Sequence, residues 1–365
     1  IAVHSSRYLS TSMSEFGVYV HIPFCRHRCD YCAFATWTDK DDIMESYVQA
    51  VITDIERKVA GGMPVADTVF FGGGTPTRLD PQLLVSIVKA IPVSAHAEIT
   101  IECNPDDVTP EMMRVYAAAG VNRISMGVQS MVTSVLKALN RTHDPANVEK
   151  AIAAVRSANI TSINLDLIYG VHGESLDDWK ETVRQAIALQ PTHISAYGLT
   201  VEAGTPLADD PARHPDDDDQ ADKYILVDDA LIAAGMHNYE ISNWAMPGHE
   251  CRHNKVYWSQ GNYTGFGCAA HSHFDGRRWW NLRTPERYIT AVNADETVEA
   301  ADEVLDDFGR RKEALELSLR TTDGVPVGTL DEEYLGDLVE RAGERVVLTR
   351  RGRLLANEVT LTLKP

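Results

Sequence analysis

"HIPFCRHRCDYCAF", residues 21–34, contains three of the chain's six cysteines, Cys25, Cys29 and Cys32. Their spacing is C-x3-C-x2-C, and no second cysteine pair follows, as a tetrahedral zinc site usually requires. Iron–sulfur clusters are normally held by four closely spaced thiolates. Three thiolates on a cubane cluster leave one iron open for a non-protein ligand. The spacing therefore favours an iron–sulfur cluster, and three purely structural cysteines on a loop are the alternative.

Composition limits the remaining possibilities. The chain has 365 residues, 44% of them hydrophobic, and a net charge of −19. The length indicates one large domain and a smaller one. The acidic charge argues against nucleic acid, and against an anionic membrane as the main partner. We find no apolar stretch long enough for a membrane span and no signal-peptide pattern in the first residues. A cytoplasmic protein is expected, and peripheral membrane association stays open.

Apolar segments typical of β-strands alternate with helical segments along the chain. The expected strands cover residues 17–22, 67–71, 98–102, 123–128, 162–168 and 193–197. The expected helices cover residues 41–59, 81–90, 110–119, 146–158 and 176–189. This alternation indicates parallel βαβ units. The predicted fold is therefore α/β, a partial (β/α)6 TIM-like barrel, whose site would lie at the carboxyl ends of the strands.

Glycines and polar residues follow the expected strands. The segments are FFGGGTPT at 70–77, IECNP at 101–105, GVQS at 127–130 and NLDLIYG at 164–170. The glycines let backbone approach a ligand closely, or they form a tight turn before a helix. Glu102, Gln129 and Asp166 would face the barrel mouth, where carboxylates can bind ribose hydroxyls or an ammonium group. A helix N-cap or a solvated loop end is the alternative for each.

CRHRCDYC, residues 25–32, resembles the signature of radical S-adenosylmethionine (SAM) enzymes, with Tyr31 before the last cysteine. The resemblance implies a [4Fe-4S] cluster whose open iron is chelated by SAM. The motifs YVHIPFC, GGGTP, GVQS, NR and NLDLIYG follow in the order found in the HemN-like, coproporphyrinogen dehydrogenase branch. That resemblance covers most of the chain. It implies SAM contacts from Tyr19, Gly73, Gly74, Thr75, Glu102, Gln129, Arg141 and Asp166, with Tyr31 close by.

Phe34 departs from the dehydrogenase pattern, which continues as C-x3-C-x2-C-x-C. CRHNKVYW, residues 251–258, contains H-N-x-x-Y-W and resembles the HemW-type heme chaperones; the glycine-rich stretch 261–272 fits them too. This resemblance implies heme binding and delivery to heme proteins of the respiratory chain. His253, Tyr257 and Trp258 would supply an axial ligand and an aromatic slot. Alternatively, they only pack and hydrogen-bond; His249 or His271 would then be the candidate ligands.

The chain is expected to divide into four parts. These are a flexible leader (1–16), the core barrel (17–240), a segment with H-N-x-x-Y-W and a connection (241–300), and a small C-terminal domain of the HemN type (301–365). The C-terminal domain resembles a winged helix, with a β-wing expected near 346–352. An acidic run at 209–224 is expected to be a solvated loop leading into a helix at 220–234. RRWWNLR, residues 277–283, indicates an amphipathic surface strand, or a contact with heme propionates or a partner.

Three functions from different classes fit these patterns. The first is a heme chaperone on a radical SAM scaffold, with an electron donor for the cluster as a further partner. The second is oxygen-independent oxidative decarboxylation of coproporphyrinogen III in porphyrin biosynthesis, against which Phe34 speaks. The third is a HemN-like radical SAM methyltransferase, against which the intact H-N-x-x-Y-W motif speaks. The catalytic residues, if any, cannot be assigned from the sequence.

Overall fold

A computed structural model describes residues 15–364 of the chain. The leader expected over residues 1–16 lies outside the described residues, apart from its last two. Between residues 15 and 364, every helix is too short or too polar to cross a membrane.

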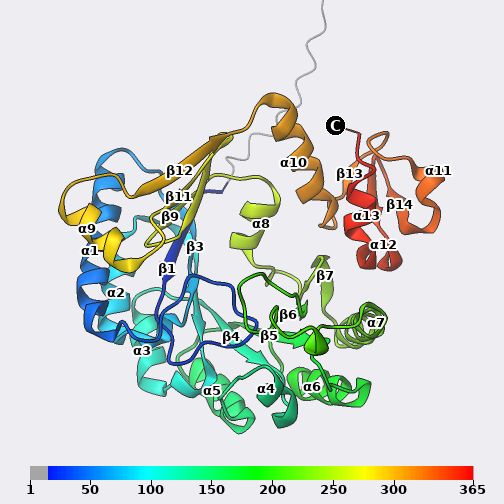
Figure 1. Ribbon diagram of the computed structural model, residues 1–365, viewed down its shortest axis with the longest axis horizontal. Helices are drawn as coiled ribbons and strands as arrows, with labels where there is room; N and C mark the ends of the chain where they lie inside the picture. Colours follow the sequence, from blue (N-terminus) through cyan, green and yellow to red (C-terminus); the bar gives the residue numbers. More distant parts are fainter. Residues whose placement is uncertain (1–14, 365) are drawn as a thin grey trace, which may run out of the picture.

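Six parallel strands form the centre of the molecule, as the alternating pattern predicted (Figure 1). They are β1 (Gly17–Ile22), β2 (Ala66–Gly73), β3 (Val93–Cys103), β4 (Arg123–Gln129), β5 (Ser162–Tyr169) and β6 (His193–Gly198). Each pairs in parallel with the next. The helices around them are α1 (Met44–Ala60), α2 (Pro81–Ala90), α3 (Pro110–Ala118), α4 (Thr133–Ala138), α5 (Pro145–Ser157) and α6 (Leu176–Ala188). The predicted partial barrel is confirmed.

Helix starts in the barrel follow local sequence signals. Asp80, Thr109 and Asp144 each cap a helix that begins with proline, and each accepts a hydrogen bond from a backbone N–H of the first turn. Proline fits the first helical position because its missing N–H would have no partner there. Ser175 and Asp178 form a reciprocal capping box at α6. These short-range signals explain why the helices were predictable.

The central sheet extends beyond the barrel on both edges, to twelve strands among the described residues. One edge adds β9 (Tyr263–Phe266), β10 (His271–Phe274), β11 (Arg277–Asn281) and β12 (Glu299–Val304) next to β1; the other adds β8 (Asn243–Ala245) and β7 (His237–Glu240) next to β6. β9 runs parallel to β1, and β10 to β12 follow antiparallel. The segment 241–300 thus contributes strands to the main sheet. The four-part division of the chain stays a prediction.

The turn after β9 depends on Gly267. Its φ is +90°, and a Cβ there would lie 2.3 Å from the Tyr47 hydroxyl and 2.7 Å from the His21 carbonyl oxygen. Only glycine combines this left-handed conformation with so close an approach. The turn therefore lies directly against β1 and fixes where β10 begins.

A second, smaller core lies in the C-terminal region. It contains α10 (Asp307–Leu319), β13 (Val325–Pro326), α11 (Glu332–Leu335), β14 (Val339–Ala342), β15 (Arg345–Leu348), α12 (Arg350–Leu354) and α13 (Ala356–Thr360). The buried side chains of Leu319, Val346 and Val359 pack together there. The prediction of a β-wing at 346–352 is wrong in its bounds. The hairpin ends at Leu348, and α12 follows because Thr349 caps it by accepting a hydrogen bond from Gly352 N–H.

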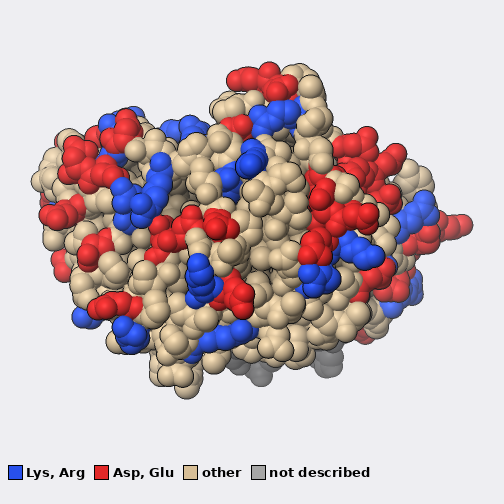
Figure 2. Space-filling view, turned by 90° about the horizontal axis from the view of Figure 1, so that it is seen from below, with Lys and Arg blue, Asp and Glu red and all other residues tan. Residues whose placement is uncertain are grey.

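The prediction for the acidic run at 209–224 is also wrong in part. It is not a loop up to residue 220, because α7 (Asp217–Ala233) begins within it. Asp216 caps the helix, and three more aspartates occupy its first turn, where negative charge is favourable near the positive end of the helix dipole. Figure 2 shows acidic side chains across the face seen from below, with one dense group on the side where α6 and α7 lie in Figure 1.

Candidate functional site

The cysteine loop leaves β1 and is held at both ends. Cys25 N–H donates to the Trp37 carbonyl oxygen at 3.0 Å, and Trp37 N–H donates to that of Pro23 at 2.8 Å. At the loop's far side, Asp30 accepts from Arg213 at 2.9 Å and from Asn140 at 2.8 Å. The loop is therefore fixed against segments that lie more than a hundred residues away in the sequence.

The three cysteines line a cavity of about 640 Å³ at the carboxyl ends of the strands. Of the nine residues expected at or near SAM, eight line the same cavity: Tyr31, Gly73, Gly74, Thr75, Glu102, Gln129, Arg141 and Asp166. The volume falls within the ~300–1,000 Å³ typical of cofactor sites. The structure therefore brings together residues from the ends of four strands and from two loops.

Polar groups surround the cysteine sulfurs. Thr75 Oγ1 lies 3.7 Å from Cys25 Sγ, and an Arg141 nitrogen lies 3.8 Å from Cys29 Sγ. Burial raises the pKa of the Cys25 and Cys32 thiols, so they are protonated until a metal displaces the proton. The positive guanidinium suits the thiolates that a cluster would create. This donor set fits a [4Fe-4S] cluster.

A cubane cluster is ligated at three different irons, so its thiolates need not converge on one point. Among residues 15–364, no group of three or more His, Cys, Asp or Glu side chains converges on a single metal ion.

Two carboxylates lie close together in this cavity. The pKa of Glu102 is raised to about 8, chiefly by burial and also by the nearby Asp166 carboxylate, while a hydrogen bond from the Gly73 backbone acts in the opposite direction. Burial also raises the pKa of Asp166, although it accepts hydrogen bonds from Ser125 at 3.0 Å and Asn164 at 2.8 Å. Two partly desolvated like charges are stabilised by a cationic ligand. SAM carries a sulfonium and an ammonium group, which fit this pair.

Backbone irregularities shape the cavity wall. β4 contains a bulge between Gly127 and Gln129, and Gln129 has a φ of 63°, in the left-handed region that non-glycine residues rarely adopt. Such bulges turn a side chain away from the regular alternation of the strand. Gly73 has a φ of +102°, and a Cβ there would lie 2.3 Å from the His21 ring. Gly73 therefore has two roles: it allows close packing against His21, and it forms part of the cavity wall.

The two tyrosines expected near SAM occupy different places. Tyr31 lines the cysteine cavity, and burial, followed by the Cys29 thiol, raises its pKa. Tyr19 lines two neighbouring cavities, one of them together with Gly73, Glu102 and Asp166, and its hydroxyl lies 3.0 Å from His21 Nδ1. The structure does not place Tyr19 among the residues that surround the cysteines, and its contact with SAM stays a prediction.

Sequence reasoning missed the contribution of β6. Tyr197, Thr200 and Glu202, at and after the end of this strand, also line the cysteine cavity. The rule that sites lie at the carboxyl ends of barrel strands applies to AYGLT, residues 196–200, as it does to the five earlier strands. This signal would have found them.

The histidine of the H-N-x-x-Y-W motif is buried and fully hydrogen-bonded. It lies on α8 (Arg252–Trp258) with 1% of its surface exposed. His253 Nδ1 lies 2.8 Å from Thr68 Oγ1, and Nε2 lies 2.7 Å from the Tyr257 hydroxyl. Desolvation lowers the pKa of His253 to about 3, so the ring is neutral. It could bind a heme iron only after losing one of these bonds, which favours the packing alternative for this residue.

Helix α8 lies at the amino-terminal ends of the barrel strands. Glu98 near the start of the parallel part of β3 accepts from the backbone N–H groups of Arg252 and His253, at 3.2 and 3.1 Å. His253 and Tyr257 line one cavity together with Tyr19, whereas Trp258 lines another cavity beside α10. The structure therefore brings together two of the three residues expected to form one heme slot, and Trp258 lies apart from them.

Comparisons with known proteins agree with this geometry. The family model for the radical SAM superfamily matches residues 19–186. The chain is 39% identical to the heme chaperone HemW of Mycobacterium tuberculosis, over 95% of this chain and 94% of that protein. It is 36% identical to the heme chaperone HemW of Escherichia coli, over 95% and 97% respectively. The chain belongs to the HemW family. Two further members, from Bacillus subtilis and Lactococcus lactis, are 34% and 31% identical.

Among solved structures, coproporphyrinogen III oxidase (HemN) from E. coli superposes with a TM-score of 0.83 at 21% identity, covering 96% of this chain and 90% of that one. At this identity the likeness confirms the fold alone. Membership of the radical SAM superfamily implies a [4Fe-4S] cluster and SAM, and the cysteine cavity fits both. In this HemW-family chain, Cys25, Cys29 and Cys32 would hold the cluster.

Proposed function

We propose that this protein is a heme chaperone, which binds heme and transfers it to other proteins. The proposal is carried by 39% identity to a heme chaperone HemW over nearly the full length of both chains. Phe34 supports it, because a cysteine at this position would complete the dehydrogenase pattern. We further propose heme proteins of the respiratory chain as clients. An external electron donor for the cluster is also part of the proposal.

The cluster and SAM would share the cysteine cavity. When bound, they supply one-electron chemistry at the open iron. The chain's own residues then have two roles in the proposal. Arg141 balances the negative charge of the thiolates, and Glu102 and Asp166 hold the cationic groups of SAM.

Substitution of the two carboxylates tests this SAM site. Asp166→Ala and Glu102→Ala are each expected to weaken SAM binding by about 1–3 kcal/mol, the cost of a lost hydrogen bond to a charged group. Isothermal titration of the reconstituted protein with SAM measures the change. Iron content should stay at the parent level in both variants, because neither side chain is a predicted cluster ligand. Parent-like SAM affinity in both variants would contradict the assignment.

Heme uptake by the parent protein tests the proposed function itself. Titration with ferric heme is expected to give a Soret band that saturates at about one heme per chain. The same preparation, reduced and supplied with SAM, should not convert coproporphyrinogen III into protoporphyrinogen IX. Conversion would support the oxidase alternative, and the absence of a saturable Soret band would refute the chaperone proposal.

A further inference from the structure

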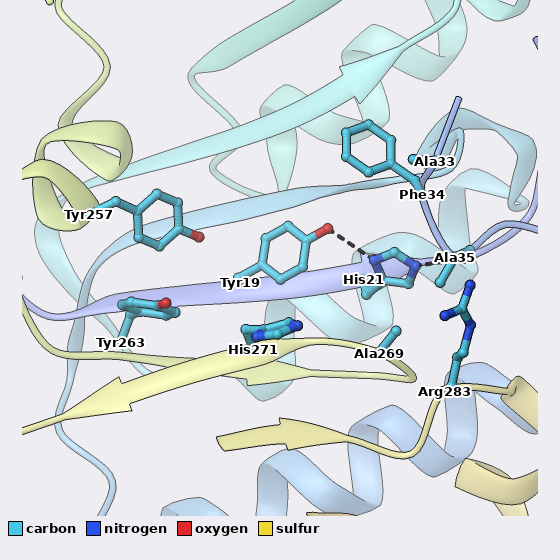
Figure 3. A pocket seen from close by; sticks show the side chains of 10 residues that line it. All are labelled: Tyr19, His21, Ala33, Phe34, Ala35, Tyr257, Tyr263, Ala269, His271 and Arg283. Atoms are coloured by element: carbon cyan, nitrogen blue, oxygen red, sulfur yellow. Dashed lines mark hydrogen bonds between the residues drawn. The ribbon is translucent and has the colours of Figure 1, made fainter. Parts of the chain in front are cut away.

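A second cavity lies beside the cysteine cavity, with a volume of about 440 Å³. We call it the His271 pocket; its walls come from β1, β9, β10, α8 and the end of the cysteine loop. Figure 3 shows the rings of Tyr19, Tyr257, Tyr263 and His271 turned toward it, with Arg283 at the end opposite Tyr263. An enclosure of aromatic rings with few polar groups is typical of sites for flat, largely apolar ligands.

His271 is the histidine in this pocket whose ring is available to a ligand. Its side chain is exposed, and the ring stacks on Trp280 of the neighbouring strand at 5.7 Å. Within residues 15–364 neither ring nitrogen forms a hydrogen bond. His21 also lines the pocket, but its Nδ1 lies 3.0 Å from the Tyr19 hydroxyl and its Nε2 lies 2.9 Å from the Ala35 carbonyl oxygen. Only His271 can therefore offer a nitrogen without losing a bond.

Phe34 and Arg283 contribute an apolar ring and a positive charge to the pocket. Phe34 is 64% exposed, an unusual state for a large apolar side chain, and it lines both the His271 pocket and the cysteine cavity. An apolar ligand in the His271 pocket would cover its ring. Arg283 forms no ion pair with any other described residue, and a guanidinium binds a carboxylate strongly. The pocket thus offers an imidazole, aromatic faces and one free cation.

We propose that heme binds in the His271 pocket, with His271 as the axial ligand of the iron and Arg283 paired with a propionate. This inference rests on the proposed chaperone function and names its site. A neutral imidazole is a common axial ligand of heme iron. The volume lies within the ~300–1,000 Å³ range of cofactor sites. Phe34 would then separate the heme from the cluster, in the position where the dehydrogenase pattern has a cysteine.

The test compares three variants of the full chain by titration with ferric heme. His271→Ala is expected to shift the Soret band and to weaken binding about tenfold or more, because the iron loses its axial ligand. Free imidazole should restore the parent spectrum by occupying the vacated position. Arg283→Gln should weaken binding of heme without shifting the band, and should leave the affinity for heme dimethyl ester unchanged. His253→Ala serves as the matched control and should keep the parent band.

The outcomes separate this inference from the proposed function. A parent protein that takes up no heme refutes both. A parent that binds heme, with His271→Ala giving the same band and affinity, overturns the His271 pocket alone. If the Soret band shifts in His253→Ala but not in His271→Ala, the axial ligand is His253 on α8. Iron content and the unfolding midpoint of each variant establish that the fold is retained.

Discussion

Replacing any one of Cys25, Cys29 and Cys32 by Ala is expected to abolish the iron–sulfur cluster. The reconstituted parent should hold about four irons per chain and absorb broadly in the visible region. Each cysteine lines the same cavity, and the C-x3-C-x2-C loop contains no further thiol that could replace a lost one. Iron analysis and the visible spectrum after anaerobic reconstitution measure the loss, which should be nearly complete in each variant.

Cys103→Ala is the matched control for this experiment. Cys103 is buried at the end of β3 and lines the same cavity, yet it lies outside the C-x3-C-x2-C loop. Its replacement should leave the iron content unchanged, as should replacement of Cys268, whose sulfur lies 3.6 Å from the Tyr47 hydroxyl. Loss of iron in the Cys103 variant would mean that the ligand set is not the one proposed. Tetrahedral zinc without iron uptake would refute the radical SAM interpretation.

Asp228→Ala is expected to lower the free energy of unfolding by about 1.5–3 kcal/mol, because it removes a buried carboxylate that accepts hydrogen bonds from two partly exposed arginines. Asp228 on α7 is fully buried and lies 2.7 Å from Arg350 and 2.9 Å from Arg353 of α12. It also accepts from the Trp244 indole N–H at 2.8 Å. This single carboxylate therefore joins the barrel to the C-terminal region. Denaturant unfolding followed by tryptophan fluorescence measures the change.

Asp229→Ala provides the control for the network. Asp229 pairs with the same Arg350 at 2.6 Å, but its side chain is 61% exposed. Exposed pairs contribute little, so the loss should stay below about 1 kcal/mol. Equal effects of the two substitutions would show that burial of Asp228 does not decide the strength of the network.

The barrel was predictable because its signals are local. Each strand is an apolar run, the helices α2, α3, α5 and α6 begin at capping residues, and each strand pairs with its neighbour along the chain. The pairing of β9 with β1 has no such signal. It joins residues 17–20 to 263–266, and the close approach of Gly267 to His21 and Tyr47 is a feature of the folded structure. The acidic start of α7 was missed because a run of aspartates suggests a loop, although the same charge favours a helix N-terminus.

The candidate site was predictable to the extent that it follows the strand ends. Glu102, Gln129 and Asp166 were placed in one cavity by that rule alone. The hydrogen bonds of His253 could not be predicted, because Thr68 lies 185 residues away and nothing in the sequence joins the two residues. Availability of a ring nitrogen is a property of the packed structure. For this reason the sequence left His253, His249 and His271 open as ligands, and the choice of His271 is a proposal drawn from the packed structure.

The anchoring of the cysteine loop has a consequence for how the protein matures. Asp30 is held by Arg213, and its carbonyl oxygen accepts from Leu207 N–H at 3.1 Å. During synthesis the loop emerges from the ribosome long before these partners do. It can adopt its final shape only after residue 213 has been added, and β1 stays unpaired on one side until residues 263–266 follow. Assembly of the iron–sulfur cluster is therefore expected late, on a nearly complete polypeptide.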